Sequence, residues 1–265
     1  MLYFSSQLNI QKHKPAADRM FAVLDLFNIK YKLLNNTKDI WLRDFMPVKT
    51  KSGKYISFRY EPSYLANNQQ LRTNFKTDIA PSFKVDNPVY SDINLDGGNV
   101  VFSPSKEKVV ISDRVFLENH GISEAELTAK LEKLLEASVL IIPSLKSDMT
   151  GHADGMVRFV DENTVVTNAP LSPYGFEAKV KKSLQNYGFN VIDFPYFYSK
   201  GDSAVGCYLN YLATEKSIFL PVFGVDTDNE AIKLAKNIFD KIIIPVNINE
   251  IAKYGGLLNC ISWED

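Results

Sequence analysis

Five side chains of this sequence have the chemistry of a catalytic site. Cys260 offers a thiol that becomes a nucleophile when it loses its proton, and His152 offers an imidazole that can donate or accept a proton. Asp44, Asp96 and Asp154 offer carboxylates, which can orient an imidazole or bind a cation. Together these residue types suit nucleophilic catalysis that is assisted by an acid–base group.

Residues of this kind recur at a nearly constant spacing. Asp44, Asp96, His152, Cys207 and Cys260 follow one another at intervals of 52, 56, 55 and 53 residues. In a closed ring of repeated units, residues of equal phase meet near the ring axis. The spacing therefore predicts five units around a central site. Asn210 shares this phase, and we expect it to make a polar contact near the site.

Glycines mark the same positions along the chain. Asp96 is followed by Gly97–Gly98, Gly151 and Gly155 flank the His152–Asp154 segment, and Gly255–Gly256 precedes Cys260. Glycine permits tight turns and a close approach of backbone to a ligand. These positions therefore indicate backbone that lies close to a site.

The elements that must position these residues follow one order, namely hairpin, helix, strand. The clearest unit has strands Asn99–Ser103 and Lys108–Ser112, a helix from about Glu124 with Ser123 and Glu126 in capping-box spacing, and a buried strand Ser138–Pro143. The next has strands Met156–Val160 and Thr164–Asn168, a helix from about Phe176 to Tyr187, and strand Asn190–Phe194. We expect a third with strands Cys207–Ala213 and Ser217–Pro221, a helix near Asp228 capped by Thr227 with Glu230, and strand Ile242–Val246.

The N-terminal region fits the same order more loosely. It shows a helix Ala16–Phe27, a strand Ile40–Val48, a turn at Ser52–Gly53 and a strand Tyr55–Tyr60. Alternation of strands and helices is common to any α/β protein. The shared phase of the polar residues is what favours a ring, and we predict one domain over residues 1–265.

Bulk composition excludes several functional classes. The 265 residues carry a formal net charge of -1 with scattered Lys and Arg, so no nucleic-acid partner is expected. We expect no membrane partner, because the apolar stretches are too short to span a bilayer and the start does not resemble a signal peptide. Two cysteines do not make a disulfide framework, and a reducing cytoplasmic setting is expected.

Four segments give this chain a specific resemblance. Asp39–Val48 (DIWLRDFMPV), Leu95–Asn99 (LDGGN), Gly151–Asp161 (GHADGMVRFVD) and Gly255–Ser262 (GGLLNCIS) resemble, in order, the motifs of the agmatine deiminase and bacterial peptidylarginine deiminase family. That family belongs to the guanidino-group-modifying enzymes, so the resemblance implies a five-bladed α/β propeller. It also implies hydrolysis of a guanidino group to a ureido product and ammonia.

The resemblance assigns a role to each residue. Cys260 matches the nucleophile, His152 the general acid and base, and Asp96 the carboxylate that orients His152. Asp44 and Asp154 match the pair that binds a guanidinium, a planar cation with a pKa above about 12. Asn210 and Trp41 are further candidates for contact with substrate. The mechanism passes through an S-alkylthiouronium on cysteine and needs no metal or other cofactor.

Three departures from the family pattern affect detail. Phe45–Met46–Pro47 follows the first motif's Asp, where the family usually has Gly before Pro. Asn259 precedes the nucleophile, where His is usual. Asp96 stands where most members carry Glu, which shortens its reach to His152 by one methylene. A more open site could admit an arginine within a peptide.

Each residue taken alone has a plainer interpretation. Cys260 could be a core residue, Asp44 could pair with Arg43, Asp96 could belong to a turn, and His152 could cap a loop. We interpret Cys207 as structural, His13 and His120 as surface or turn residues, and Trp263 as a packing residue. The joint occurrence of ordered motifs at one phase favours the functional interpretation.

Several functions remain open at this stage. Agmatine and peptidyl-arginine are the main candidate substrates, followed by arginine and methylated arginine. An amidinotransferase would use the same residues, and a non-catalytic guanidinium-binding pseudoenzyme would keep the pocket. A cysteine protease with a Cys260–His152 dyad would explain neither Asp44 nor Asp154. The sequence does not indicate an oligomeric state.

Overall fold

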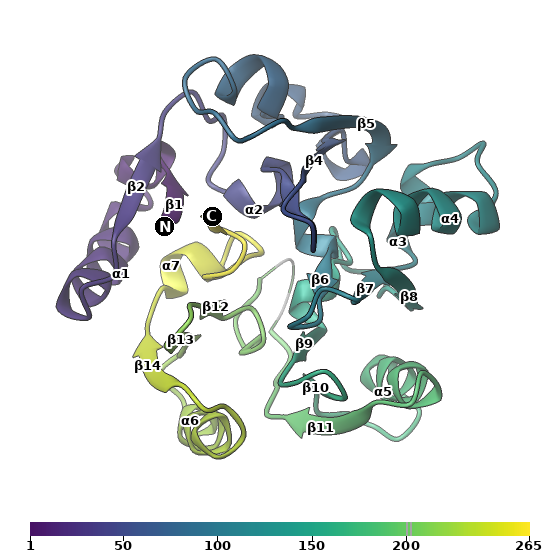
Figure 1. Ribbon diagram of the computed structural model, residues 1–265. Helices are drawn as coiled ribbons and strands as arrows, with labels where there is room; N and C mark the ends of the chain where they lie inside the picture. The colour runs from purple at the N-terminus through teal and green to yellow at the C-terminus, as the bar shows by residue number, and fades with distance from the viewer. Residues whose placement is uncertain (200, 202) are drawn as a thin grey trace.

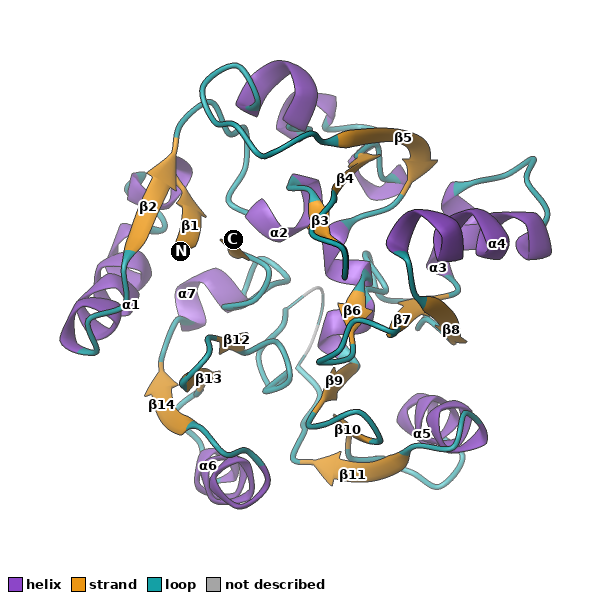
Figure 2. Cartoon of the chain, viewed as in Figure 1, coloured by secondary structure: helices purple, strands orange, loops and turns teal. Residues whose placement is uncertain are grey.

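Five three-stranded sheets surround a central axis in the computed structural model, which describes residues 1–199, 201 and 203–265 (Figure 1). In each of them a short strand pairs antiparallel with a middle strand, and a third strand joins the middle one in parallel. We call each sheet with its helices a blade. The blades stand around the axis with most helices on the outside (Figure 2).

The elements follow the predicted order in three blades. One contains β6 (Val101–Phe102), β7 (Lys108–Ser112), α3 (Arg114–Glu118), α4 (Glu124–Leu135) and β8 (Ser138–Ile142). The next contains β9 (Val157–Phe159), β10 (Thr164–Asn168), α5 (Phe176–Asn186) and β11 (Asn190–Phe194). The third contains β12 (Leu212–Ala213), β13 (Ser217–Pro221), α6 (Thr227–Ile238), β14 (Ile242–Val246) and α7 (Asn249–Ala252).

The other two blades are built from the N-terminal region and the last strand. One contains α2 (Leu42–Phe45), β3 (Val48–Lys49), β4 (Tyr55–Arg59) and β5 (Val89–Asn94), with 3-10 turns at Ser63–Leu65 and Gln69–Leu71 and a π turn at Phe75–Ile79. The last contains β1 (Leu2–Ser5), α1 (Lys14–Leu26), β2 (Tyr31–Leu34) and β15 (Ser262–Glu264).

The ring is closed by strands from opposite ends of the sequence. β15 pairs antiparallel with β1, with Leu2 opposite Glu264, and β1 pairs in parallel with β2. Sequence analysis did not predict β1, β2 or β15, since each is only three or four residues long. A closed ring leaves no blade without two neighbours, which is how a propeller protects the sides of its sheets.

Apolar patterning explains why the blades pack. The strand β7 is the middle strand of its sheet. Its buried residue Val110 faces the next blade, while Val109 and Ile111 pack on the buried face of α4. That face is formed by Leu127, Leu131 and Leu135, which lie four residues apart on one side of the helix. Ser123 caps α4 by accepting a hydrogen bond from the backbone of Glu126, as its spacing predicted.

Two predicted strands are wrong. Ile40–Val48 contains α2, because Leu42 and Phe45 lie three residues apart, both are buried, and a helix places them on one face. Asp44 is therefore on a helix rather than a strand. Of Cys207–Ala213, only β12 is a strand, and the preceding residues form turns that begin after Gly206, which has a φ of +98°.

Two further expectations need correction. Thr227 does not cap α6; instead Asp228 accepts hydrogen bonds from the backbones of Phe223, Gly224 and Val225, since a carboxylate is the stronger acceptor. His13 lies in a turn, as predicted, but it is not on the surface, because it is 2% exposed and its ring meets Tyr254 edge-on. His120 is exposed, as predicted. No helix in the described part of the chain is long and apolar enough to cross a bilayer.

Candidate active site

The segments that carry the predicted site residues meet at the axis. They are α2, the turns Gly97–Asn99 and Ala153–Gly155, and the loops that precede β12 and β15. Hydrogen bonds from backbone amides to backbone and side-chain acceptors join neighbouring segments of the ring. The Arg43 amide donates to the Cys260 carbonyl at 3.0 Å, and the Ala153 amide donates to the Asn99 side chain at 3.2 Å. The site is therefore assembled from segments far apart in the chain.

His152 lies between two carboxylates. Its Nε2 is 2.9 Å from Asp96 Oδ2, and its Nδ1 is 3.6 Å from Asp44 Oδ1. Burial alone would lower the pKa of His152, but the charges of Asp44 and Asp96 and the Asp96 hydrogen bond outweigh it and raise the pKa to about 10. His152 is therefore in its cationic imidazolium form at neutral pH.

Gly98 is required by this geometry. A side-chain carbon at Gly98 would lie 2.6 Å from Asp44 Oδ1 and 2.7 Å from His152 Nδ1, too close for either atom. The Gly98 backbone also donates to Asp44 Oδ1 at 3.1 Å. Burial is the main reason that the pKa of Asp44 is raised above its usual value. The glycine after Asp96 thus lets the backbone reach both Asp44 and His152.

Cys260 lies on the other side of the site, against Asp154. Its Sγ is 3.6 Å from Asp154 Oδ2 and accepts a hydrogen bond from Asn210 Nδ2 at 3.1 Å. Asn210 and Asn259 also donate to Asp154 Oδ2, at 3.0 and 2.7 Å. Burial, followed by the charges of Asp154 and Asp44, raises the pKa of Cys260 well above its usual value. Without a bound cation, the thiol keeps its proton.

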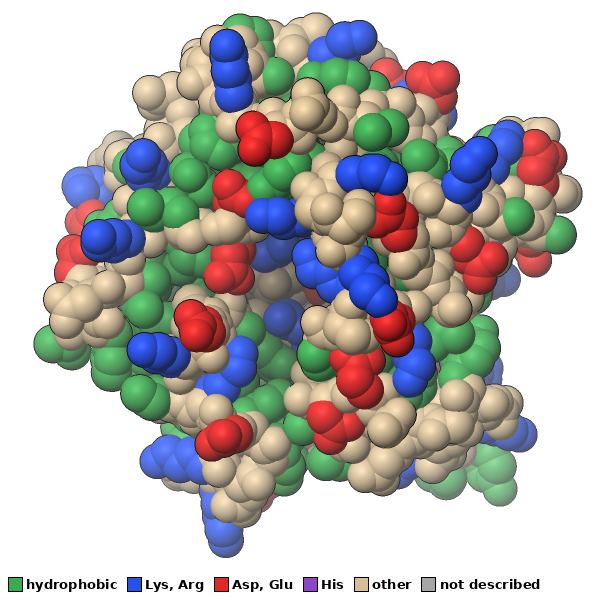
Figure 3. Space-filling view, viewed as in Figure 1, with side chains coloured by type: hydrophobic (Ala, Val, Ile, Leu, Met, Phe, Trp, Pro, Cys, Tyr) green, Lys and Arg blue, Asp and Glu red, His purple; other side chains and the backbone are tan. Residues whose placement is uncertain are grey.

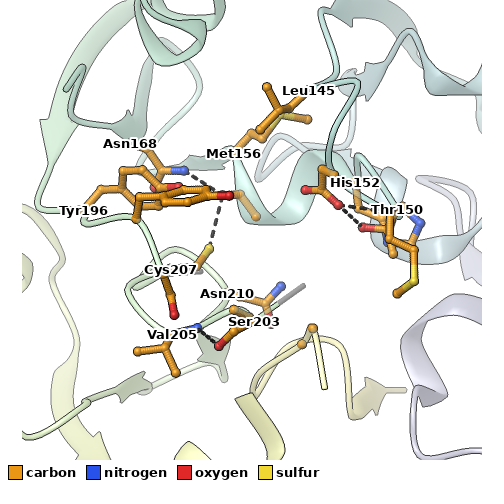
Figure 4. Close-up of a pocket in the computed structure, with 18 of the residues that line it drawn as sticks. Leu145, Thr150, His152, Met156, Asn168, Tyr196, Ser203, Val205, Cys207 and Asn210 are labelled. Atoms are coloured by element: carbon orange, nitrogen blue, oxygen red, sulfur yellow. Dashed lines mark hydrogen bonds between the residues drawn. The ribbon is translucent and has the colours of Figure 1, made fainter. Parts of the chain in front are cut away.

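One pocket connects these side chains to solvent. Its lining includes His152, Asp154, Asn210 and Cys260 (Figure 4). In that view His152 and Thr150 lie on one side of the pocket, and Asn168 and Tyr196 lie on the other. The Cys260 thiol and the His152 imidazole are therefore both accessible from this pocket.

Trp41 lies beside this pocket. Its ring packs directly on Gly256, which lines the pocket, and a side chain at Gly256 would collide with it. Trp263 is 3% exposed and packs against Tyr3 and Phe83, which confirms its predicted packing role.

A second cavity approaches the site along the axis. Figure 3 shows the centre of one face hollowed, with Lys and Arg side chains around the hollow. The cavity is lined by Arg43, Lys106 and Arg158, and it reaches Asp154 and Asn259. Asp154 lines both spaces, so it lies between a basic cavity and the pocket that contains Cys260.

Cys207 lines the same pocket as Cys260 but has different partners. Its Sγ donates to the Gly155 carbonyl at 3.3 Å. Burial, with a smaller contribution from the Asp154 charge, raises the pKa of Cys207 to about 12. A protonated thiol bonded to backbone fits the structural role predicted for it.

Two contacts of the site were not predicted. The Tyr64 hydroxyl donates to Asp96 Oδ2 at 2.8 Å, and Asn259 donates to Asp154. Asn259 was noted only as a departure from a motif. Tyr64 lies between β4 and β5, where the repeat has no counterpart, so its spacing gave no signal. Among the residues that the structure describes, no cluster of His, Cys, Asp and Glu is arranged to hold a metal ion.

Comparison with known proteins identifies a family whose model matches almost the whole chain. The model of the Porphyromonas-type peptidyl-arginine deiminase family matches residues 6–265. A curated Lactococcus lactis protein with the provisional name agmatine deiminase is 34% identical over 65 residues. That stretch is 24% of this chain and 18% of the relative, and an Enterococcus faecalis protein matches similarly, at 32% over 66 residues. The matched stretches thus span less than a fifth of each curated relative.

Solved structures match over the full length. The agmatine deiminase of C. jejuni is 18% identical with a TM-score of 0.78, over 99% of this chain and 92% of that one. DDAH from Pseudomonas aeruginosa, in a complex with citrulline, is 12% identical with a TM-score of 0.64, over 98% and 97%. At these identities the likeness shows the fold, and the predicted five-bladed α/β propeller is confirmed.

Proposed function

Because this chain belongs to the Porphyromonas-type peptidyl-arginine deiminase family, we propose that it hydrolyses a guanidino group to a ureido group and ammonia. One observation carries the proposal. The Cys260 thiol and the His152 imidazole line one pocket, each against a buried carboxylate, with Asp154 3.6 Å from the sulfur and Asp96 2.9 Å from the imidazole. That arrangement suits a cationic carbon centre better than a neutral carbonyl.

The two carboxylates Asp44 and Asp154 account for binding. A guanidinium stays charged at any physiological pH and presents its N–H groups in one plane. Carboxylates at two edges of the ion, in that plane, accept these N–H groups and hold the face of the central carbon in front of the sulfur. Asp44 and Asp154 are 7% and 3% exposed, so each has lost most of its water and gains strongly from a cationic partner.

The bound cation also accounts for activation of the thiol. The charges of Asp154 and Asp44 contribute to the high pKa of Cys260 in the free site. A guanidinium between them places a positive charge near the sulfur that offsets part of this negative charge, which favours the thiolate. The substrate therefore helps to generate the nucleophile that attacks it.

The bond changes then follow in two halves. The thiolate forms a bond to the guanidinium carbon, His152 gives its proton to one nitrogen, and that nitrogen leaves as ammonia, which produces an S-alkylthiouronium. In the second half, His152 takes one proton from water and the oxygen adds to the same carbon. The C–S bond then breaks, and the second proton of that water is released to ammonia or solvent. The products are a ureido compound and the free thiolate, so the reaction breaks a C–N bond of a linear amidine.

The mouth of the pocket favours a substrate with a second positive end. Asp148 and Glu177 line it, and no Lys or Arg is found among its described lining residues. Asn168 donates to the Gly155 carbonyl, which fixes its amide, and its Oδ1 is buried without a partner among the described residues. Agmatine, which carries an amine, satisfies these acceptors, whereas the carboxylate of free arginine meets no Lys or Arg among the lining residues that the structure describes.

Peptidyl-arginine is the second candidate substrate. Met149 and Tyr198 line the pocket and are 38% and 62% exposed, so the rim offers apolar contacts to a peptide. Amidino transfer to an amine would use the same site residues, because the group that resolves the thiouronium is not part of the protein. A guanidinium-binding module without turnover would keep Asp44 and Asp154 but would not need Cys260.

A substrate panel with two cysteine variants tests the proposal. Ammonia and ureido product should be measured with agmatine, arginine, methylarginines and arginine peptides. Cys260→Ser should lower turnover of the best substrate by about 10³-fold or more, since it removes the nucleophile. Cys207→Ser, the matched control in the same pocket, should stay within a few-fold of the original protein. Equal rates for the original protein and Cys260→Ser would refute the cysteine mechanism.

A further inference from the structure

Tyr64 and His152 bind the same oxygen atom. Asp96 Oδ2 lies 2.8 Å from the Tyr64 hydroxyl and 2.9 Å from His152 Nε2. The two rings meet edge-on with centroids 6.4 Å apart. Burial, followed by the charge of Asp96, raises the pKa of Tyr64 well above its usual value, so the phenol keeps its proton and remains a donor.

A polar cluster on the neighbouring blade fixes the position of Tyr64. The residue lies in the turn Ser63–Leu65, and Glu118 at the end of α3 accepts from the Ser63 backbone at 2.9 Å and from its hydroxyl at 2.6 Å. Arg114 holds Glu118 through a contact of 3.0 Å. Glu118 and Arg114 are 11% and 19% exposed at their side chains, so this tether is largely shielded from solvent.

The charged and titratable groups around this contact come from several segments. Asp44 and Asp154 act on His152 together with Asp96, and Tyr60 and Asp44 act on Tyr64. Arg114 and Glu118 line a small cavity next to Asp96 and His152. Of these groups, Tyr64 is the one whose hydroxyl competes directly with His152 for the Asp96 oxygen.

We propose that Tyr64 is a positioning residue of the site, which holds the Asp96 carboxylate against His152 and limits how strongly that carboxylate stabilises the imidazolium. The proposal rests on the role of His152 in the proposed function. Asp96 is shorter by one methylene than the Glu that the family usually carries, and a second hydrogen bond compensates by restricting the rotation of a short side chain. A carboxylate that shares its charge with a phenol attracts a proton on the imidazole less strongly.

The proposal predicts the direction of two effects. Tyr64→Phe frees the Asp96 oxygen from one donor, so its charge acts on His152 alone and the pKa of His152 rises. With a higher pKa, the His152 imidazolium gives up its proton less readily, and a less restricted Asp96 orients the imidazole ring less well. We expect kcat to fall roughly tenfold, the size expected for a lost hydrogen bond to a charged group, with KM within about twofold. The alkaline limb of the kcat profile should move to higher pH.

Titration of the three histidines tests this without depending on turnover. Ring-proton NMR of the full chain should show a higher pKa for His152 in Tyr64→Phe than in the original protein. Tyr208→Phe is the matched control, because Tyr208 is also a buried phenol that donates to a carboxylate, Asp228, at 2.7 Å. It should lower thermal stability and leave both His152 and the alkaline limb unchanged.

Two results would overturn the proposal. One is an unchanged His152 titration in Tyr64→Phe, and the other is a loss of thermal stability like that of Tyr208→Phe with kcat and the alkaline limb preserved. Glu118→Gln provides a second variant if Tyr64→Phe does not fold. It keeps the phenol, loosens its tether, and should shift His152 in the same direction by a smaller amount. Absence of activity toward every guanidine would refute the proposed function but would leave the NMR comparison interpretable.

Discussion

The two buried histidines of this protein differ in charge at neutral pH, where one is neutral and the other is a cation. His13 and His152 are 2% and 7% exposed, so each has lost nearly all its water. The pKa of His13 is lowered to about 4 by burial and by the nearby charge of Lys12. The pKa of His152 is raised to about 10, because Asp44 and Asp96 flank its ring.

The difference shows that burial alone does not produce a proton donor. In a low-dielectric setting an imidazole loses its charge unless anions repay the cost of desolvation, and only the axis of the ring supplies them. The same carboxylates disfavour the thiolate of Cys260, since they raise the pKa of an acid that becomes negative. The free site therefore holds a charged imidazole and a neutral thiol, and a cationic ligand at Asp44 and Asp154 favours ionisation of the thiol.

Asp96→Asn should abolish most of the contrast between the two histidines, and it carries the largest expected effect. Without the Asp96 charge, the pKa of His152 falls toward that of His13. The loss of a positioned general acid should lower kcat by roughly 10²–10⁴-fold. Asp228→Asn is the control, because it removes a buried carboxylate that touches neither histidine. Retention of kcat in Asp96→Asn would show that His152 is not the proton donor.

Asp154→Asn tests the thiol side of the site. Its expected effects are smaller, namely weaker binding of a guanidine and a more reactive thiol in the free protein. Loss of one carboxylate should raise KM for a guanidine by about 10–100-fold, as expected when one charged hydrogen-bonding partner is removed. The pKa of Cys260 should fall, so its alkylation by iodoacetamide in the free protein should become faster. The Cys207→Ser background assigns this reaction to Cys260. Slower alkylation would contradict the electrostatic account.

His13 provides the smallest effect, on stability rather than activity. Its pKa of about 4 in the folded state lies below the usual 6.5, so its contribution is present above pH 6.5 and is lost as the pH falls toward 4. We expect His13→Leu to remove about 1–2 kcal/mol of the difference in unfolding free energy between pH 7.5 and pH 5. Urea titrations at the two pH values measure it. An equal pH dependence in both proteins would show that His13 titrates normally.

The sequence predicted the fold well where each blade repeats a strong local pattern. The middle strands and the α4, α5 and α6 helices carry apolar residues at the spacing their structures require. Prediction failed where contacts between blades decide the structure. β1 and β15 are short and pair across the ends of the sequence, and α2 is a single turn that depends on the burial of Leu42 and Phe45.

The site shows the same division. Ordered motifs and a common phase placed Asp44, Asp96, His152, Asp154 and Cys260 at one location, which the structure shares. The partners that set their protonation could not be found in this way. Tyr64 comes from a connection with no counterpart in the repeat, and Asn259 donates to a residue 105 positions away. Sequence spacing shows which residues converge, whereas hydrogen-bond geometry shows how each is charged.

A trapped covalent intermediate is the most direct test of the central claim. The protein should be mixed with agmatine, quenched in acid at a series of times during turnover, digested and examined by mass spectrometry. The account predicts that the peptide containing Cys260 gains the mass of the substrate less one ammonia, and that the Cys207 peptide is unmodified. Release of ureido product with no modification of Cys260 under any quench time, or modification at Cys207 instead, would contradict it.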